Sequence, residues 1–202
     1  TGALELQPTT LEAYPDLARV VTAAGGSSVV PACSGNPDDD LWYSFTPTGT
    51  TAAFVGGSTV NTFTAQLFNG GCGALNSLDC RSGLAGSAFR VHYEDLVPGS
   101  TYHLRVHTGD NQTGTFTPMF FGPPANDEIT GAALITPGGT PYAEAYGGTH
   151  WTYGASRSFG RMCGTQGDPD DDVWFHFIAN SATHTVTAAV FNPFFPETDN
   201  SG

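Results

Sequence analysis

Short runs in which aromatic, threonine and β-branched residues alternate with polar residues follow one another through the first part of the chain. An alternation with a period of two places successive side chains on opposite faces of a strand, so each run predicts a half-buried β-strand. Clusters of Gly, Pro, Ser, Asn and Asp separate the runs and are typical of turns. The predicted strands cover residues 41–45, 51–55, 64–68, 89–93, 101–107 and 114–121. This spacing favours an all-β fold, namely an antiparallel β-sandwich of the jelly-roll or immunoglobulin-like kind.

The run TYHLRVH over 101–107 shows the alternation most clearly. Its core face is expected to carry Tyr102, Leu104 and Val106, and its other, wet face His103, Arg105 and His107. We expect this strand to form a hairpin with 89–93, which would bring His92 near the other two histidines. Three neighbouring histidines can bind a transition metal, but exposed strand histidines are more often ordinary surface groups.

The chain also resembles itself. Cys33 is followed by PDDDLWYSF around Trp42, and Cys163 by PDDDVWFHF around Trp174, which is 174 − 42 = 132 residues further on. The opening TGALEL similarly matches TGAALI from residue 130. A repeat of this length predicts tandem copies of one module, with both tryptophans as core anchors. The proline-rich stretch GPPANDE places the boundary between residues 1–122 and residues 123–202.

Compared with the first copy, the second is expected to hold only the N-terminal half of a sandwich. Half a sandwich leaves a sheet edge open and a core unfilled, and both cost more than a small domain can offset. Two alternatives follow. Either the chain is a fragment of a longer array of repeats, or another segment or subunit supplies the missing strands.

The net charge of the chain restricts the kinds of molecule that it is expected to bind. The chain has 19 acidic residues against 6 arginines and no lysine, for a net charge of −13. This balance argues against nucleic acid and against anionic membrane surfaces, because both require a basic face. No apolar run is long enough to predict a membrane span.

The acidic clusters before the two tryptophans are the best chemical candidates. Adjacent carboxylates repel one another unless a cation lies among them, and Ca²⁺ prefers six to eight oxygen ligands. The alternative is that one carboxylate caps a turn while the others stay in water. The predicted calcium ligands are Asn36, Asp38, Asp39 and Asp40 in the first copy, and Asp168, Asp170, Asp171 and Asp172 in the second.

Four cysteines predict oxidised pairs in a secreted protein. Cys72 and Cys80 enclose a short loop, and we expect a local disulfide between them. Cys33 and Cys163 occupy equivalent positions in separate copies and are expected to lie too far apart to pair with each other. They could pair with cysteines outside this chain, pair between chains, or remain buried thiols.

Other features carry weaker predictions. The sequon at Asn111 lies at a predicted hairpin tip and is a possible glycosylation site. Asn126 and Asp127 could form a turn or an ion site. Aromatic residues near Trp151 could stack on a carbohydrate, although they more often pack a sandwich edge. The common catalytic motifs, such as GxSxG, HExxH and the P-loop, do not occur, so we expect no enzymatic activity.

The order of these segments resembles the secreted bacterial pre-peptidase C-terminal domain. The resemblance rests on the ANDE opening, the D-[LV]-W-[YF]-x-F strand, LFNGGCGALNSLDC, LVPGSTYHLRVHT and TGTFTPMFF. It covers most of the first copy and the first half of the second. It implies an extracellular β-sandwich accessory module without catalysis, often repeated beside peptidases and sometimes bound to calcium.

Two functions are compatible with the sequence. The first is an extracellular structural or adhesive repeat protein, such as a surface or filament subunit completed by β-strand addition from another copy or repeat. The alternative is an accessory region of a larger secreted hydrolase that binds calcium or carbohydrate.

Overall fold

The computed structural model describes residues 2–8, 21–23, 31–35, 40–71, 73–85, 89–108, 112–137, 152–157 and 172–186. Strands dominate these residues, so the all-β prediction is confirmed. Contacts divide the chain into two compact units, Thr1–Gly122 and Pro123–Gly202. Among the described residues, no helix is long and apolar enough to cross a membrane.

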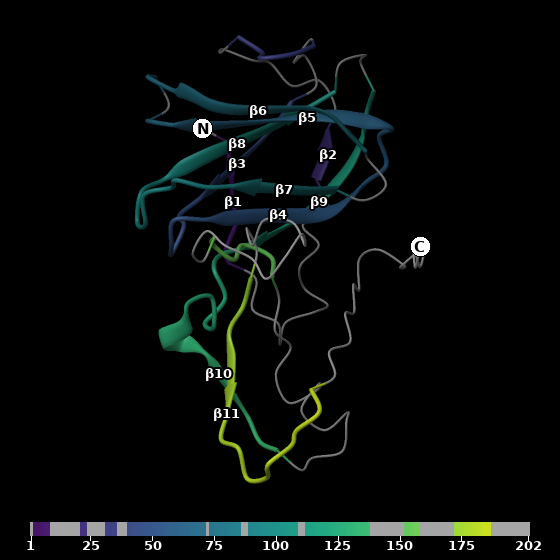
Figure 1. Cartoon of the computed structure of the whole chain (residues 1–202). Helices are drawn as coiled ribbons and strands as arrows, with labels where there is room; N and C mark the ends of the chain where they lie inside the picture. Colours follow the sequence, from purple (N-terminus) through teal and green to yellow (C-terminus); the bar gives the residue numbers. More distant parts are fainter. Residues whose placement is uncertain are drawn as a thin grey trace. The chain divides into compact units, whose positions relative to one another are not determined.

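The first unit is a sandwich of two sheets (Figure 1). Sheet A has the strand order β1-β3-β8-β5-β6, and sheet B the order β2-β9-β4-β7. The strands of sheet A are β1 (Leu4–Glu5), β3 (Leu41–Phe45), β8 (Tyr102–His107), β5 (Thr62–Asn69) and β6 (Asn76–Ala85). The strands of sheet B are β2 (Val21–Ala23), β9 (Gly114–Phe121), β4 (Ala52–Ser58) and β7 (Phe89–Tyr93).

From β3 to β9 the chain crosses repeatedly between the two sheets. Only β5 and β6 are consecutive strands that pair with each other in this stretch. The predicted hairpin between 89–93 and 101–107 is therefore wrong, because β7 lies in sheet B and β8 in sheet A. Crossing suits these short strands, since each sheet then contributes one apolar face to a shared core.

The core lies between the inner faces of the two sheets and is rich in aromatic rings. Phe54 of β4 is fully buried, and its ring contacts those of Phe45, Tyr93 and Phe120 at centroid distances of 4.9, 6.0 and 5.4 Å. Two of these ring pairs are edge-on and the Phe54–Phe120 pair is stacked, and such pairs add to the stabilisation that burial of apolar surface already provides. These contacts join β3 of sheet A to β4, β7 and β9 of sheet B.

The central strands are buried on both faces, which the alternation does not predict. All six residues of β8 are buried, including Arg105 and His107. The prediction of a wet face for His103, Arg105 and His107 is therefore wrong. Part of the cover comes from residues 31–35, because Arg105 donates a hydrogen bond to the Pro31 carbonyl oxygen. Remote segments that pack on a sheet leave no periodic signal in the strand itself.

The edge strand β6 pairs with β5 through two register shifts, between Phe63 and Ala65 and between Leu67 and Phe68 of β5. At each shift the longer stretch of residues belongs to β6. Such bulges bend an edge strand and make it a poorer template for pairing with another chain.

The second unit contains a short 3₁₀ helix, η1 (Ile129–Gly131), and the strands β10 (Ala133–Ile135) and β11 (Phe175–Phe177). β10 and β11 pair in parallel as a two-stranded sheet.

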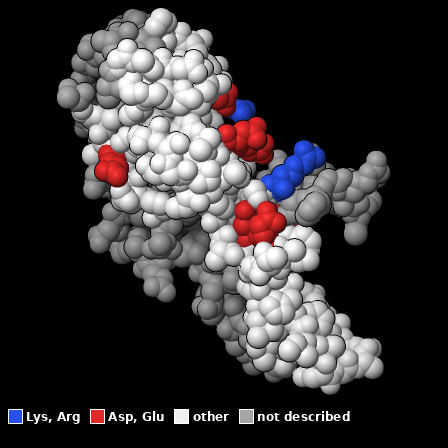
Figure 2. All heavy atoms as spheres, turned by 90° about the vertical axis from the view of Figure 1, so that its left-hand side faces the viewer, with Lys and Arg blue, Asp and Glu red and all other residues white. Residues whose placement is uncertain are grey.

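Charged side chains are sparse on the face of the molecule shown in Figure 2, in agreement with a charged fraction of 12%. Most of the described surface on this face is uncharged.

Replacement of Phe54 by alanine should strongly destabilise the first unit. The substitution removes a fully buried ring and leaves a cavity among three others, which costs about 3–5 kcal/mol in the free energy of unfolding. The control is Val97→Ala, because Val97 is 59% exposed and its truncation should change stability by less than about 0.5 kcal/mol. Native-state hydrogen exchange of the β8 amides measures the change in stability in both variants. Equal effects of the two variants would contradict this description of the core.

Two buried tyrosines should make the protein sensitive to alkali. Burial raises the pKa of Tyr43 and of Tyr93, and nearby Asp79 raises that of Tyr93 further while Arg81 lowers it. The folded state therefore keeps both hydroxyls protonated where the unfolded chain loses its protons, so stability is full below about pH 10 and falls above it.

We expect the free energy of unfolding to fall above about pH 10 by up to roughly 1.4 kcal/mol per pH unit for each tyrosine. Denaturant unfolding between about pH 8 and pH 11 measures this slope. Tyr43→Phe should reduce it, and an identical slope in that variant would contradict the assignment.

Candidate functional site

Four side chains form one row across the outer face of sheet A. Trp42 of β3 pairs with Arg105 of β8, Arg105 with Gln66 of β5, and Gln66 with Cys80 of β6. Directly opposed residues of neighbouring strands lie on the same face of a sheet. The register of four strands therefore brings together residues that are far apart in the sequence.

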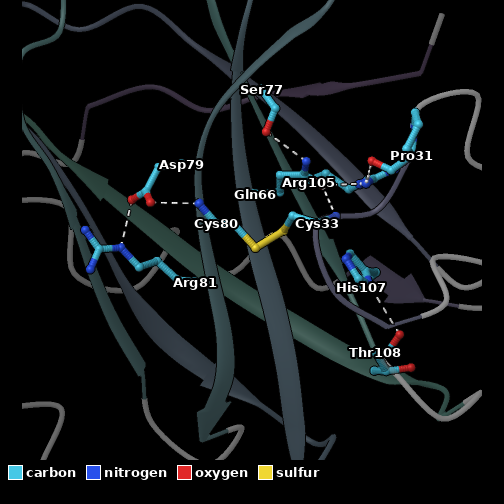
Figure 3. The surroundings of a disulfide bond; sticks show 10 residues. All are labelled: Pro31, Cys33, Gln66, Ser77, Asp79, Cys80, Arg81, Arg105, His107 and Thr108. Carbon is cyan, nitrogen blue, oxygen red and sulfur yellow. Dashed lines mark hydrogen bonds and ion pairs between the residues drawn. A yellow bond between two sulfur atoms is a disulfide. The ribbon is translucent and has the colours of Figure 1, made fainter.

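Arg105 is the centre of this row and is fully buried. Its guanidinium donates hydrogen bonds to the Pro31 carbonyl oxygen at 2.9 Å and to the Gln66 Oε1 atom (Figure 3). The guanidinium carbon also lies 5.4 Å from the ring centroid of Trp42 and 5.5 Å from that of Phe68. Hydrogen bonds and aromatic faces together replace the water that the cation loses on burial.

Gln66 connects the arginine to the disulfide. Its Oε1 atom also accepts from the backbone N–H of Cys33 at 3.4 Å, and its Nε2 atom donates to the Ser77 hydroxyl at 2.9 Å. Cys33 is bonded to Cys80, with 6.1 Å between the two Cα atoms. Figure 3 shows the disulfide beside Gln66 and the arginine. The segment 31–33 is therefore held on sheet A by one covalent bond, by a hydrogen bond that Arg105 donates to Pro31 and by one that Gln66 accepts from Cys33.

Asp40 contributes the nearby negative charge. It is 7% exposed, and its Oδ2 atom accepts a hydrogen bond from the indole N–H of Trp42 at 2.9 Å. Burial lowers the pKa of Arg105, and the Asp40 carboxylate opposes this shift by favouring the charged guanidinium. Asp40 thus orients the ring on which the cation lies and partly balances the charge of that cation.

The disulfide corrects the predicted pairing. Sequence proximity favours a Cys72–Cys80 bond, but Cys80 is bonded to Cys33, which also removes the expectation that Cys33 pairs outside this chain or stays a thiol. The reason is the register, because Cys80 belongs to the outer row of sheet A over which residues 31–33 lie. Cys72 and Cys163 lie outside the described residues.

The predicted calcium loops are described only in part, so the calcium prediction stays untested. Asp40 accepts a hydrogen bond from the indole N–H of Trp42, and Asp172 is half-buried. Within the described ranges, no group of three or more His, Cys, Asp or Glu side chains could hold a metal ion. The remaining predicted ligands, and the predicted glycosylation site, lie outside those ranges: Asn36, Asp38, Asp39, Asp168, Asp170, Asp171 and Asn111.

The expected histidine cluster is not formed. His103 and His107 lie on the covered face of β8, on either side of Arg105, whereas His92 lies on β7 in the other sheet. The Nδ1 atom of His107 contacts the Thr108 carbonyl oxygen at 3.2 Å, so this buried ring is oriented by its own backbone.

In the second unit, Asn126 and Asp127 are structural residues. The Asn126 side-chain amide donates to the Trp174 carbonyl oxygen at 3.1 Å, and the backbone carbonyl oxygen of Asn126 accepts from the Trp174 N–H at 2.8 Å. The Asp127 carboxylate accepts from the N–H and the hydroxyl of Ser156 at 2.6 and 2.8 Å. Both residues are buried, and their hydrogen bonds tie the start of this unit to residues far along the chain.

The two units contain the same strand pairing. In the first, β1 pairs in parallel with β3, with Leu4 opposite Tyr43. In the second, β10 pairs in parallel with β11, with Ala133 opposite Phe175. When TGALEL is aligned with TGAALI and the two tryptophan segments are aligned, these residue pairs coincide.

The surroundings of the paired strands differ. Tyr43 and Phe45 are each 1% exposed, whereas their counterparts Phe175 and Phe177 are 42% and 43% exposed. β3 has the antiparallel strand β8 on its second edge. Of the strands that the structure describes, only β10 pairs with β11.

Comparison with known proteins leaves the chain unassigned. No protein-family model matches it, and no curated protein is significantly similar to it in sequence. The resemblance to the pre-peptidase C-terminal domain therefore stays a prediction.

Removal of the disulfide should destabilise the first unit. The bond joins residues 47 positions apart, and a loop of this length restricts the unfolded chain by about 4 kcal/mol in the chain-entropy model. The double variant Cys33→Ser and Cys80→Ser should lose most of this stability in denaturant unfolding. Cys72→Ser is the control and should retain the linked peptides of Cys33 and Cys80 in a non-reducing digest read by mass spectrometry. A digest of the unmodified protein that links Cys72 to Cys80 would contradict the pairing.

Proposed function

We propose that this chain is a non-catalytic, extracellular structural or adhesive protein made of two copies of one β-sandwich module. The second copy is completed by strands from a neighbouring subunit or from a further repeat. Partners of this protein are therefore other modules of its own kind, joined through sheet edges. Such strand addition provides affinity through main-chain hydrogen bonds and specificity through alternate side chains.

One observation carries the proposal. The same parallel strand pair, in the same register, lies in a closed sandwich in the first unit and presents exposed aromatic rings in the second. A strand whose aromatic side chains are largely exposed offers an apolar face on which another segment can pack. The shared register supports two copies of one module. The difference in side-chain exposure supports the proposal that strands of another subunit or repeat cover β11.

Further features support an extracellular setting. The Cys33–Cys80 disulfide is of a kind that persists in oxidising compartments. The polar side chains of the row around Arg105 hold residues 31–33 on sheet A, which is a structural role. Calcium in the two acidic loops would add rigidity of the kind that extracellular repeats need, and this remains part of the proposal.

The state of β11 tests the proposal. In dilute protein we expect the β11 amides to exchange with solvent much faster than those of β3, because β3 has partners on both edges. At higher concentration the mass measured by light scattering should rise, and the β11 amides should become protected in parallel. The same light-scattering measurement in excess chelator shows how far the assembly depends on a bound cation.

The test variant is Phe177→Ser, and its matched control is Leu78→Ser. Both side chains are exposed apolar groups, at 43% and 45%, but only Phe177 belongs to β11. Phe177→Ser should weaken assembly, whereas Leu78→Ser should not. A monomer at all concentrations in which β11 is as well protected as β3 would overturn the proposal.

A further inference from the structure

Residues 31–35 cover part of the outer face of sheet A, but they add little to the core of the first unit. Pro31 and Cys33 are exposed, and none of the five residues is buried. Among the described residues, the apolar cluster between the two sheets contains no member of this segment. Because stabilisation by burial grows with the apolar area removed from water, the segment gains little from it.

The described contacts that hold the segment on the sheet are polar or covalent. Arg105 donates to the Pro31 carbonyl oxygen at 2.9 Å, and the Cys33 N–H donates to the Gln66 Oε1 atom at 3.4 Å (Figure 3). Each hydrogen bond adds only modestly to stability, because water offers an equivalent partner when the segment leaves. The Cys33–Cys80 bond is therefore the strongest of these connections.

Two effects favour release of the segment once the disulfide is cut. Arg105 is fully buried, and water in place of the Pro31 carbonyl would restore part of the hydration that burial removes. The segment would also regain conformational entropy that the disulfide takes away. Gln66, Trp42 and Phe68 would stay beside the cation, because they belong to the neighbouring strands of the same sheet.

External thiols can reach this disulfide from the side of the covering segment. Cys33 is exposed and Cys80 is half-buried, and exposed disulfides exchange with thiols more readily than buried ones. An external thiolate that attacks the Cys33 sulfur displaces the Cys80 sulfur as a thiolate, and a second external thiol then frees Cys33. In sum, the Cys33–Cys80 disulfide becomes two thiols while two external thiols become one disulfide.

We propose that the Cys33–Cys80 disulfide is a redox switch that responds to thiols. Its reduction releases residues 31–35 from sheet A and exposes Arg105 to solvent, while the core between the two sheets keeps the first unit folded. The oxidised module covers its cation, and the reduced module presents a guanidinium beside the indole ring of Trp42. The switch belongs to the first unit alone and does not depend on how the second copy is completed.

The test measures the accessibility of Arg105 in the full chain. A 1,2-dicarbonyl reagent modifies exposed guanidinium groups, and mass spectrometry of the digest locates the modification. Reduction uses a trialkylphosphine, which is oxidised to its phosphine oxide with the oxygen of one water molecule. Modification of Arg105 should become at least roughly tenfold faster after reduction, because the segment that covers it opens. Arg90 is the internal reference, since it is exposed on sheet B and should react equally in both states.

Two variants serve as controls. Cys72→Ser keeps the Cys33–Cys80 bond and should respond to reduction as the unmodified protein does. The double variant Cys33→Ser and Cys80→Ser should show rapid modification of Arg105 without any reductant. Hydrogen exchange of the β4 amides reports in each sample whether the core of the first unit remains folded.

Each outcome decides the proposal. Rapid modification of Arg105 only after reduction, with the β4 amides still protected, supports it. Equal modification before and after reduction would mean that the segment never covers the cation, and the proposal is then wrong. Slow modification in protein whose Cys33 and Cys80 are shown to be free thiols overturns it as well. Loss of β4 protection together with exposure of Arg105 would show global unfolding instead of a switch.

Discussion

A buried guanidinium is stable only where hydrogen bonds and polarisable groups replace its water, and the first unit is organised around that requirement. Arg105 has a backbone carbonyl on one side, the Gln66 amide on another and two aromatic rings across its faces. These groups come from three separate parts of the chain, namely residue 31, β3 and β5, and the cation itself comes from β8. The cation therefore constrains the register of β3, β8 and β5 and the position of residues 31–33 at the same time.

The two units share, in sequence, the aspartate and the tryptophan of this arrangement. Each tryptophan strand is preceded by aspartate, and in the first unit this pair forms one wall of the arginine site. In the second unit, Asp172 and Trp174 stand at the sequence positions that correspond to Asp40 and Trp42. Specific pairing of sheet edges depends on such side-chain matches, because the main-chain hydrogen bonds are the same for every sequence.

Local alternation predicts the strands well. β3, β7 and β9 have the predicted bounds, and β4, β5 and β8 differ from prediction by a few residues at their ends. β6 is missed because NSLDCRSGLA is polar and bulged, and its shape follows from pairing with β5 and not from its own pattern. The two-residue strand β1 is too short to show a period. The face of β8 that carries Arg105 is misjudged because part of its cover comes from residues 31–35, and the Cys33–Cys80 pairing is missed because the same remote segment carries Cys33.

The disulfide also determines how the first unit would transmit tension. A pull along the backbone passes from Cys33 through the two sulfur atoms to Cys80, so β3, β4 and β5 are bypassed. The 47-residue separation would otherwise contribute about 160 Å of extended chain. In a protein that bears load between neighbours, the part of the module that contains the tryptophan strand would keep its shape while segments outside the loop lengthened.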